Sequence, residues 1–453
     1  MAFSPAPGRP ARPIDLLLTP FRVLAHHATA GSVLLVVATV AALAWANSPW
    51  HASYERVWEA PLAIGVGPWQ LELTVREWIN DGLMTLFFLV VGLEIERELL
   101  VGTLARPRAA ALPIAAAVGG MLAPAGLYLL FTAGTPAQHG WGVPMATDIA
   151  FALGLLGLLA PGAPPAVRAF LAALAIVDDL GAILVIALFY SGQLDVSALR
   201  WAAALVALLV LLNRLGARQP VAYLLVGLPF WYALHASGIH ATIAGVVLAF
   251  AIPARTRVNS GEFVQELEEN LARFRSSANL ATDAYTDASQ MQAMDEIGIA
   301  YRNAQSPSLQ VERTLHVWVA LLILPLFALA NAGVHLGDAG LGVLALPPAL
   351  GVMAGLVLGK PVGITLAAWL AVRAGLAEKP ASVSWLHIVA AGCLGGIGFT
   401  MALFIIALAF GHAPLADTGK LAILVASTAA ALLGAAMLRL AGGPVIDRAA
   451  GAA

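Results

Sequence analysis

Long apolar runs separated by short polar segments dominate the hydropathy pattern of this chain. A helix needs about 20 apolar residues to cross the ~30 Å hydrocarbon core of a bilayer, because each residue advances it by about 1.5 Å. Twelve runs are long enough to span a bilayer, or nearly so, at residues 29–47, 79–99, 110–133, 141–160, 167–190, 198–213, 219–236, 238–253, 314–336, 345–373, 386–411 and 416–440. The pattern therefore predicts an all-α polytopic membrane protein with about twelve transmembrane helices.

Two stretches depart from this pattern. Residues 62–73 contain two short segments of alternating polarity around a Gly-rich turn, which is typical of a β-hairpin. Residues 254–313 are polar but carry apolar side chains at helical spacing, namely Phe263, Leu267, Leu271 and Phe274. We expect a short external β-hairpin in the first stretch. In the second we expect a cytoplasmic helical loop that is solvated or rests on the membrane; a regulatory module is the alternative.

Composition supports the membrane assignment and excludes other classes. Hydrophobic residues make up 60% of the chain and charged residues 11%, against about 25% charged in a soluble domain. The formal net charge of −2 gives no basic surplus for binding nucleic acid. The single cysteine, Cys393, excludes an intrachain disulfide and a Cys-based zinc site.

The distribution of basic residues predicts the orientation in the membrane. If the N-terminus is cytoplasmic, 19 of the 24 Lys and Arg residues fall in cytoplasmic segments and four in external ones. The positive-inside rule then places both termini in the cytoplasm. The expected organisation is an N-terminal segment (1–28), helices one to eight (29–253), the polar loop (254–313), helices nine to twelve (314–440) and a tail (441–453).

Two adjacent carboxylates, Asp178 and Asp179, lie in the middle of the fifth apolar run. An ionised Asp at the centre of a bilayer costs at least about 2.5 kcal/mol, so such residues are candidates for a functional site. The alternative is a pair neutralised by other side chains, which gains little over apolar packing. The pair therefore predicts a site that binds or passes a cation or a proton.

Helix-breaking residues mark two further runs. In the fourth, Pro144 cannot donate a backbone hydrogen bond, and Thr147 and Asp148 offer oxygens just beyond it. A plain kinked helix with Asp148 facing a water-filled cavity is the alternative there. The eleventh run is weakened as a helix by its dense glycines, and we expect an unwound segment comprising Gly395, Gly396, Gly398 and Thr400.

The tenth run combines a bare helix face with a lysine. Its glycines recur every four residues, so another helix can approach its backbone closely; they are Gly351, Gly355, Gly359 and Gly363. Lys360 lies beside this face. A buried lysine needs a carboxylate or dipole partner, and Asp178 is the obvious candidate.

The second run carries acids at both ends, with Asp81 near the outer end and Glu94, Glu96 and Glu98 near the inner one. The inner group has two interpretations. It is either an ordinary solvated helix end or a funnel that concentrates cations.

These residues resemble one family specifically, the NhaA-type sodium/proton antiporters. The resemblance rests on stretches that cover nearly all the apolar runs in the family's order: Asn80 to Met84, Phe87 to Glu94, Ala146 to Ala152, Ala175 to Ala182, Gly238 to Thr242, Gly359 to Pro361 and Gly398 to Met401. It implies twelve spans with an inverted repeat, in which spans three to five mirror spans ten to twelve. The fourth and eleventh spans would be unwound and cross, in a family that is itself a known example of broken helices at a transport site.

The resemblance also assigns roles at the site. It implies that Asp179 is the main Na+ ligand, that Asp178 is its partner and pairs with Lys360, and that Thr147 lies close by. Asp148 and Lys360 would offset the dipole ends of the half-helices where they cross. No cofactor is expected beyond the transported ions.

The implied activity is secondary transport, not catalysis. A member of this family would exchange cytoplasmic Na+ or Li+ for external H+ across the bacterial inner membrane, electrogenically and under control by pH. Its hairpin would pair with that of a second protomer to form a homodimer in the lipid bilayer. The residues implied in the cation funnel and pH response are Asp81, Glu94, Arg97, Glu98, His240, Glu312 and His316.

Three positions tied to pH regulation depart from the family pattern: Glu96, Ala236 and Arg313. They leave the pH threshold open. The exchange chemistry itself needs only that Na+ and protons compete for carboxylate and hydroxyl oxygens at a site that opens alternately to each side. Two protons per Na+ would move net charge, with the second carried by either Asp178 or Lys360.

Two other classes of protein fit less well. An intramembrane aspartyl protease also needs two buried Asp residues, but on different helices that face each other. Adjacent side chains on one helix diverge by about 100°. A sodium-coupled symporter would need a pocket for an organic substrate, and no further polar cluster in the apolar runs provides one.

Overall fold

The computed structural model describes residues 30–66, 69–276, 288–335, 340–411 and 414–442. The expected N-terminal segment (1–28) and residues 443–453 of the expected tail lie outside the described residues. The chain forms two compact units. Unit 1 comprises the chain up to Phe87, Glu98–Gly192 and the chain from Val317 onward, and unit 2 comprises Phe88–Arg97 and Gln193–His316. Each is described by itself.

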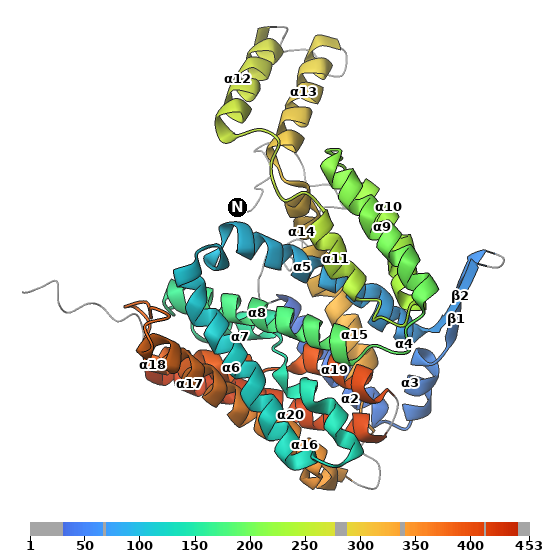
Figure 1. The fold of residues 1–453 in the computed structure, drawn as a ribbon, viewed down its shortest axis with the longest axis vertical. Helices are drawn as coiled ribbons and strands as arrows, with labels where there is room; N and C mark the ends of the chain where they lie inside the picture. Colours follow the sequence, from blue (N-terminus) through green and yellow to red (C-terminus); the bar gives the residue numbers. More distant parts are fainter. Residues whose placement is uncertain (1–29, 67–68, 277–287, 336–339, 412–413, 443–453) are drawn as a thin grey trace, which may run out of the picture. The chain divides into compact units, whose positions relative to one another are not determined.

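Unit 1 is helical apart from one β-hairpin (Figure 1). Its elements are α2 (Ala30–Ala46), α3 (His51–Trp58), β1 (Pro61–Val66), β2 (Trp69–Thr74), α4 (Val75–Glu77), the π-helix η1 (Trp78–Leu83), η2 (Thr103–Ala105), α6 (Pro107–Thr132), the 3₁₀ helix η3 (Pro136–Met145), α7 (Ile149–Leu159), α8 (Pro165–Phe189), η5 (Val319–Ile323), α15 (Leu324–Asn331), η6 (Gly340–Ala345), α16 (Pro347–Ala354), η7 (Gly355–Gly359), α17 (Lys360–Arg373), α18 (Trp385–Gly395), α19 (Phe399–Phe410) and α20 (Pro414–Ala441). Helices α5 (Met84–Val101) and α14 (Pro307–Trp318) have residues in both units.

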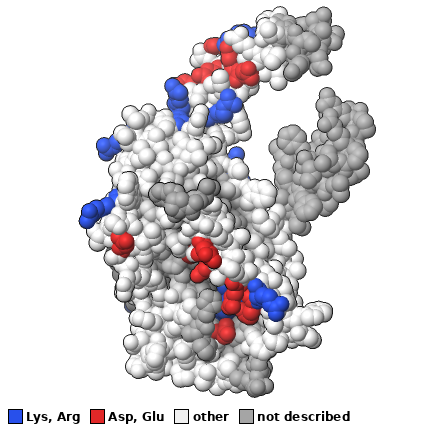
Figure 2. Space-filling view, turned by 90° about the vertical axis from the view of Figure 1, so that its right-hand side faces the viewer, with Lys and Arg blue, Asp and Glu red and all other residues white. Residues whose placement is uncertain are grey.

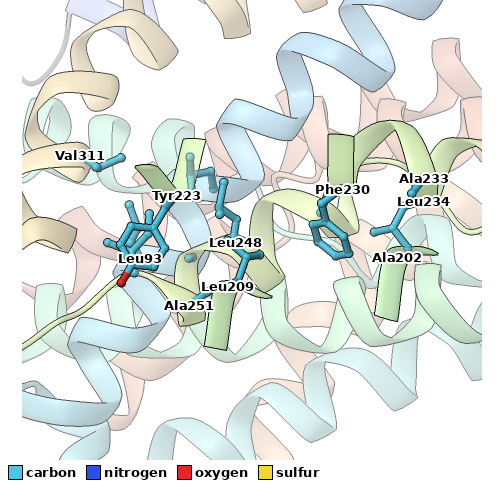
Figure 3. Close-up of a cluster of buried hydrophobic side chains, with 14 residues drawn as sticks. Leu93, Ala202, Leu209, Tyr223, Phe230, Ala233, Leu234, Leu248, Ala251 and Val311 are labelled. Carbon is cyan, nitrogen blue, oxygen red and sulfur yellow. The ribbon is translucent and has the colours of Figure 1, made fainter. Parts of the chain in front are cut away.

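Unit 2 is entirely helical within the described residues. It contains α9 (Val196–Arg214), α10 (Pro220–Ala236), α11 (Ile243–Ala251), α12 (Ser260–Ser276) and α13 (Ala288–Ala304). Its core is a cluster of buried apolar side chains that includes Leu93, Tyr223, Phe230 and Leu248 (Figure 3). Gly92 of α5 allows α5 and α11 to pack closely in this cluster, because a Cβ at Gly92 would lie 2.7 Å from the Cβ of Ala249.

Helix occupies each of the twelve predicted runs, which confirms the all-α membrane class. Among the described helices, six are long and apolar enough to cross a membrane on their own, and three bent pairs raise the number of candidate spans to nine. Three further runs fail this test for evident reasons: α5 carries three acids and Arg97, α10 has 17 residues and α11 has nine. The total of about twelve spans remains a prediction.

The two predicted helix breaks are present. Helices η3 and α7 meet at an angle of 43° across residues 146–148, and α18 and α19 meet at 45° across residues 396–398. Each broken pair lies between two long helices, α6 and α8 in one case and α17 and α20 in the other. The second break is narrower than predicted, because Gly395 still ends α18 and Thr400 lies in the first turn of α19.

The glycine face of the tenth run packs against α6, as the four-residue spacing predicts. A Cβ at Gly363 would lie 2.2 Å from the carbonyl oxygen of Gly119, and one at Gly359 would lie 2.8 Å from the Cα of Pro124. Backbone therefore meets backbone along this pair of helices. This close approach of the two backbones sets the position of Lys360, the first residue of α17, within unit 1.

The predicted β-hairpin is present, with an antiparallel register that pairs Leu62 with Leu73 and Ala63 with Glu72. The Gly-rich turn was expected over Gly65 to Pro68, but Gly65 and Val66 extend β1 and pair with Gln70 and Trp69, and residues 67–68 lie outside the described residues. Thr74 caps the next helix in a capping box with Glu77. Helix α3 was not predicted, because its eight residues are too polar to stand out as a span, yet Tyr54 and Trp58 on one face are buried.

The packing of α17 on α6 predicts that Gly363→Ala destabilises the protein. The added methyl group must displace the Gly119 carbonyl, and overpacking of this kind costs about 1–3 kcal/mol. The melting temperature in detergent, followed by tryptophan fluorescence, should fall. Gly126→Ala on α6 is the matched control, since a Cβ there meets nothing within 4 Å. Equal melting temperatures for the two variants would contradict backbone-to-backbone packing.

Candidate functional site

The two helix breaks contact each other in unit 1, and Asp148 holds them together. Its backbone N–H donates to the carbonyl oxygen of Ile397 at 2.7 Å. Its side chain caps α7 by accepting from the N–H of Phe151 at 2.9 Å, and its Oδ2 accepts from the N–H and the hydroxyl of Thr400 at 3.2 and 2.5 Å. The carboxylate therefore faces the partial positive charge at the starts of both α7 and α19.

Thr147, beside Asp148, links three elements. Its Oγ1 lies 2.6 Å from Oδ2 of Asp178 and 2.8 Å from the carbonyl oxygen of Gly395, and it accepts from Nζ of Lys360 at 2.6 Å. A hydroxyl has one proton, so it donates to the carboxylate or to the carbonyl at any one time. The hydroxyl thus connects the buried charges to the last turn of α18, where the helix dipole is negative.

Lys360 and Asp178 form an ion pair through Nζ and Oδ2, and both side chains are fully buried. The lysine follows a π-helical turn, η7, at the first position of α17. Gly120 on α6 makes room for Ile364, one turn further along α17, because a Cβ at Gly120 would lie 2.7 Å from the Cγ1 of Ile364. Removing water from each ion costs several kcal/mol, so loss of either partner would leave an expensive uncompensated charge.

Asp179 is the next residue on α8 and is 1% exposed. It interacts electrostatically with Lys360. Of the Asp178 carboxylate, Oδ2 is held by the lysine and the threonine, while Oδ1 is buried and accepts no hydrogen bond from the described residues. Two carboxylates, a hydroxyl and a main-chain carbonyl therefore come together, which is an oxygen-rich set suited to a hard cation or to protons.

This set differs from a resident metal centre. Within the described residues, no cluster of three or more His, Cys, Asp and Glu side chains could hold a metal ion. Among the described residues, the acidic side chains at the site are Asp178, Asp179 and Asp148. The carboxylate of Asp148 already accepts hydrogen bonds at the starts of α7 and α19. The donors fit a cation that is held by few charged ligands.

Four of the residues assigned to pH response come together in unit 2. Arg97 Nη2 lies 3.4 Å from Oε1 of Glu312, and His316 Nδ1 lies 3.7 Å from Oε1 of Glu94. Glu312 is 8% exposed, whereas the side chains of Arg97 and His316 are more than half exposed. The pairs join the C-terminal part of α5 to α14.

The remaining assigned residues lie in other settings. Asp81 lines a cavity of about 250 Å³ in unit 1, together with Arg76, Asn80, Asn331 and Lys420. Glu98 accepts from the N–H of Thr103 at 2.5 Å and so closes the end of α5. The Nδ1 of His240 lies 3.4 Å from the hydroxyl of Thr242, between α10 and α11.

Several supporting residues escaped the sequence analysis. Ser427 on α20 accepts from the N–H of Phe399 at 3.2 Å and so supports the start of α19. Asn331 donates to Oδ1 of Asn80 at 2.8 Å and ties α15 to η1. Both are polar residues inside apolar runs, and that signal could have flagged them, although their partners could not be read from the sequence.

Comparison with known proteins agrees with this geometry. Residues 22–438 match the family model described as Na+/H+ antiporter 1. A protein named Na(+)/H(+) antiporter NhaA from Oleidesulfovibrio alaskensis is 48% identical over 434 residues, covering 96% of each chain. Proteins of the same name from Koribacter versatilis and Acidithiobacillus ferrooxidans are each 47% identical, over 94% and 92% of this chain and 93% and 96% of their own.

The family model covers nearly the whole chain, including both helix breaks, the two adjacent aspartates and the buried lysine. The relatives match it from end to end at almost half identity. The protein therefore belongs to the Na+/H+ antiporter 1 family, a family of membrane transporters and not of enzymes.

Proposed function

We propose that this protein exchanges cytoplasmic Na+ or Li+ for external H+ across a bacterial plasma membrane, and so serves Na+ and pH homeostasis. The observation that carries the proposal is the buried group of Asp178, Asp179, Thr147 and Lys360 at the contact of two broken helices. The relatives' names support the choice of ions.

Exchange follows from competition for the same oxygens. Burial makes a carboxyl group easier to protonate, and a neighbouring acid adds to that effect. A bound Na+ would use Asp179, the Oδ1 of Asp178 and the hydroxyl of Thr147, and it would displace the proton held there. When the site opens to the more acidic side, the proton displaces the Na+.

Electrogenic exchange needs a second proton, and the ion pair offers two ways to supply it. Either Asp178 takes a proton when Na+ leaves, or Lys360 releases one when Na+ draws Asp178 away from it. Both routes move two protons per Na+ and therefore net charge. The site's position where two helices break suits alternating access, because half-helices can tilt without breaking a continuous span.

We also propose an orientation for the protein in the membrane and a group of residues that controls its response to pH. Both termini and the segment 254–313 would be cytoplasmic, following the distribution of Lys and Arg. The cluster of Glu94, Arg97, Glu312 and His316 would sense cytoplasmic pH, since histidine is the side chain type whose charge responds to pH in the physiological range.

Everted vesicles test the function directly. A proton gradient is established, its collapse on adding NaCl, LiCl or KCl is followed by dequenching of a pH-sensitive dye, and the pH is stepped from about 6.5 to about 9, above the ~6.5 reference pKa of His. Na+ and Li+ should collapse the gradient and K+ should not.

Asp179→Asn should abolish the response while the protein remains folded and inserted, because the amide keeps the shape but exchanges no proton. Wild-type exchange by this variant would end the assignment of Asp179.

Lys360→Ala should both slow exchange and destabilise the protein. It leaves Asp178 charged and unpaired in a dry interior, and breaking a buried pair costs about 3–5 kcal/mol. Melting temperature in detergent and vesicle exchange are the two readouts. Lys420→Ala is the matched control, because Lys420 pairs at 3.1 Å with Asp417, whose side chain is half exposed. A Lys360→Ala variant as stable as the control would mean that Lys360 contributes no buried ion pair.

The β-hairpin supports a proposal of homodimerisation. A two-stranded hairpin is marginally stable alone, and Leu62 and Ile64 are 44% and 53% exposed on it. Pairing with the hairpin of a second protomer would cover them by β-augmentation. The alternative is that the hairpin folds onto its own protomer.

Deleting Ala63 to Gln70 separates these alternatives. The deletion should shift the solubilised protein from dimer to monomer, as measured by size exclusion with light scattering. Vesicle exchange should persist, because the ion site is complete within one chain. If the variant stays dimeric, the hairpin is not the interface.

A further inference from the structure

Helices α12 and α13 of unit 2 form an antiparallel pair, and among the described elements each is the other's main contact. The backbone N–H of Arg257, just before α12, donates to the carbonyl of Asn303, near the end of α13, at 3.1 Å. Arg273 and Glu296 form an ion pair at 2.7 Å farther along. Contacts between α12 and α13, rather than contacts with the rest of unit 2, therefore hold this helix pair together.

The buried and half-buried positions along the pair's contact follow a heptad. On α12 Asn270 is buried, and Phe263, Leu267 and Phe274 are half-buried; on α13 Gln290, Ala293 and Ala300 are buried, and Ile297 is half-buried. The spacing of four and three makes these the a and d positions. Leu271, expected on the buried face, is instead 39% exposed, and Asn270 takes the core position.

The heptad gives the pair two different flanks. In an antiparallel coiled coil, g positions of the two helices meet on one side and e positions on the other. Arg273 and Glu296 are both g residues, and their ion pair confirms the assignment. The opposite, e flank is apolar, and its exposed members are Val264 (50%), Leu271 (39%), Met294 (54%) and Tyr301 (55%).

An apolar stripe of this kind on a polar two-helix hairpin needs a cover. Charge argues against a lipid surface: the two helices carry six acids and three arginines, and Figure 2 shows acidic side chains gathered on this part of the molecule. Anionic headgroups would repel such a surface. The surface that packs against this stripe must therefore accommodate acidic side chains and supply apolar ones.

A second copy of the same flank meets both conditions. The b positions that border the flank on α12 are Glu268 and Arg275, one on each side of Leu271. If α12 pairs antiparallel with α12 of another copy, about a two-fold axis beside Leu271, each Glu268 lies opposite an Arg275. The contact is then self-complementary in charge as well as apolar.

We propose that the e flank of α12 and α13 is an interface between two copies of this chain, which associate there as a four-helix bundle. This interface is separate from the β-hairpin and does not depend on the ion site. It gives the polar segment between α11 and α14 a role in assembly.

Cysteine cross-linking in native membranes tests the proposal. Leu271→Cys, placed beside the two-fold axis, should form an interchain disulfide on mild oxidation. Glu266→Cys, at a g position on the opposite flank of the same helix, is the matched control and should not. The parent chain sets the background, since its one cysteine, Cys393, is buried. The same pair is repeated in native membranes of the variant that lacks Ala63 to Gln70. The Leu271→Cys cross-link should persist there, because the membrane keeps the copies concentrated, whereas dilution in detergent separates copies that lack the hairpin.

A charge swap identifies the partner. In the Leu271→Cys chain, Glu268→Arg or Arg275→Glu alone should lower the cross-linking yield several-fold, because like charges then face each other. The double variant should restore it. Equal cross-linking of the two cysteine variants, no cross-link at Leu271→Cys, a product with a different protein, or failure of the double variant to recover would each overturn the proposal.

Discussion

Lys360 and Asp178 form an ion pair in which neither side chain is accessible to water. Much of unit 1 is arranged to offset the cost of burying these two charges. An ion pair in such a place is favourable only if its remaining polar atoms are satisfied. The hydroxyl of Thr147 meets both partners, and the carbonyl of Gly395 extends the contact to the end of α18. The break after α18 supplies the carbonyl of Gly395, because a continuous helix would have used it internally.

The packing that brings the pair together depends on small residues. The glycines of α16, η7 and α17 let that span lie against the backbone of α6, and Gly120 of α6 leaves space for Ile364 of α17. On the other side of the breaks, Asp148 meets two helix starts at once and Ser427 supports the second. A larger side chain at the glycine face would therefore disturb the site from a distance.

Much of this could be predicted from the sequence, because bilayer thickness, helix-breaking residues and the cost of buried charge are strong constraints. The breaks follow from Pro144 and the clustered glycines, and the pairing of Lys360 with Asp178 follows from the need of a buried lysine for a carboxylate partner. What could not be predicted depends on contacts between distant elements. The union of Asp148 with Thr400 joins residues 252 positions apart, and the burial of Asn270 in place of Leu271 depends on the register of α12 against α13. The Glu98 carboxylate accepts from the backbone of Thr103, a local contact that charge patterning does not reveal.

The central claim is that Na+ and protons compete for one set of buried oxygens. It is tested most directly by adding NaCl to the purified protein in weakly buffered detergent solution and following proton release with an indicator dye, while binding of ²²Na+ is measured in parallel. If Na+ and protons compete, protons should appear in step with bound Na+, choline chloride should release none, and Na+ affinity should fall as the pH is lowered. Na+ binding with no release of protons, and with an affinity independent of pH, would contradict it.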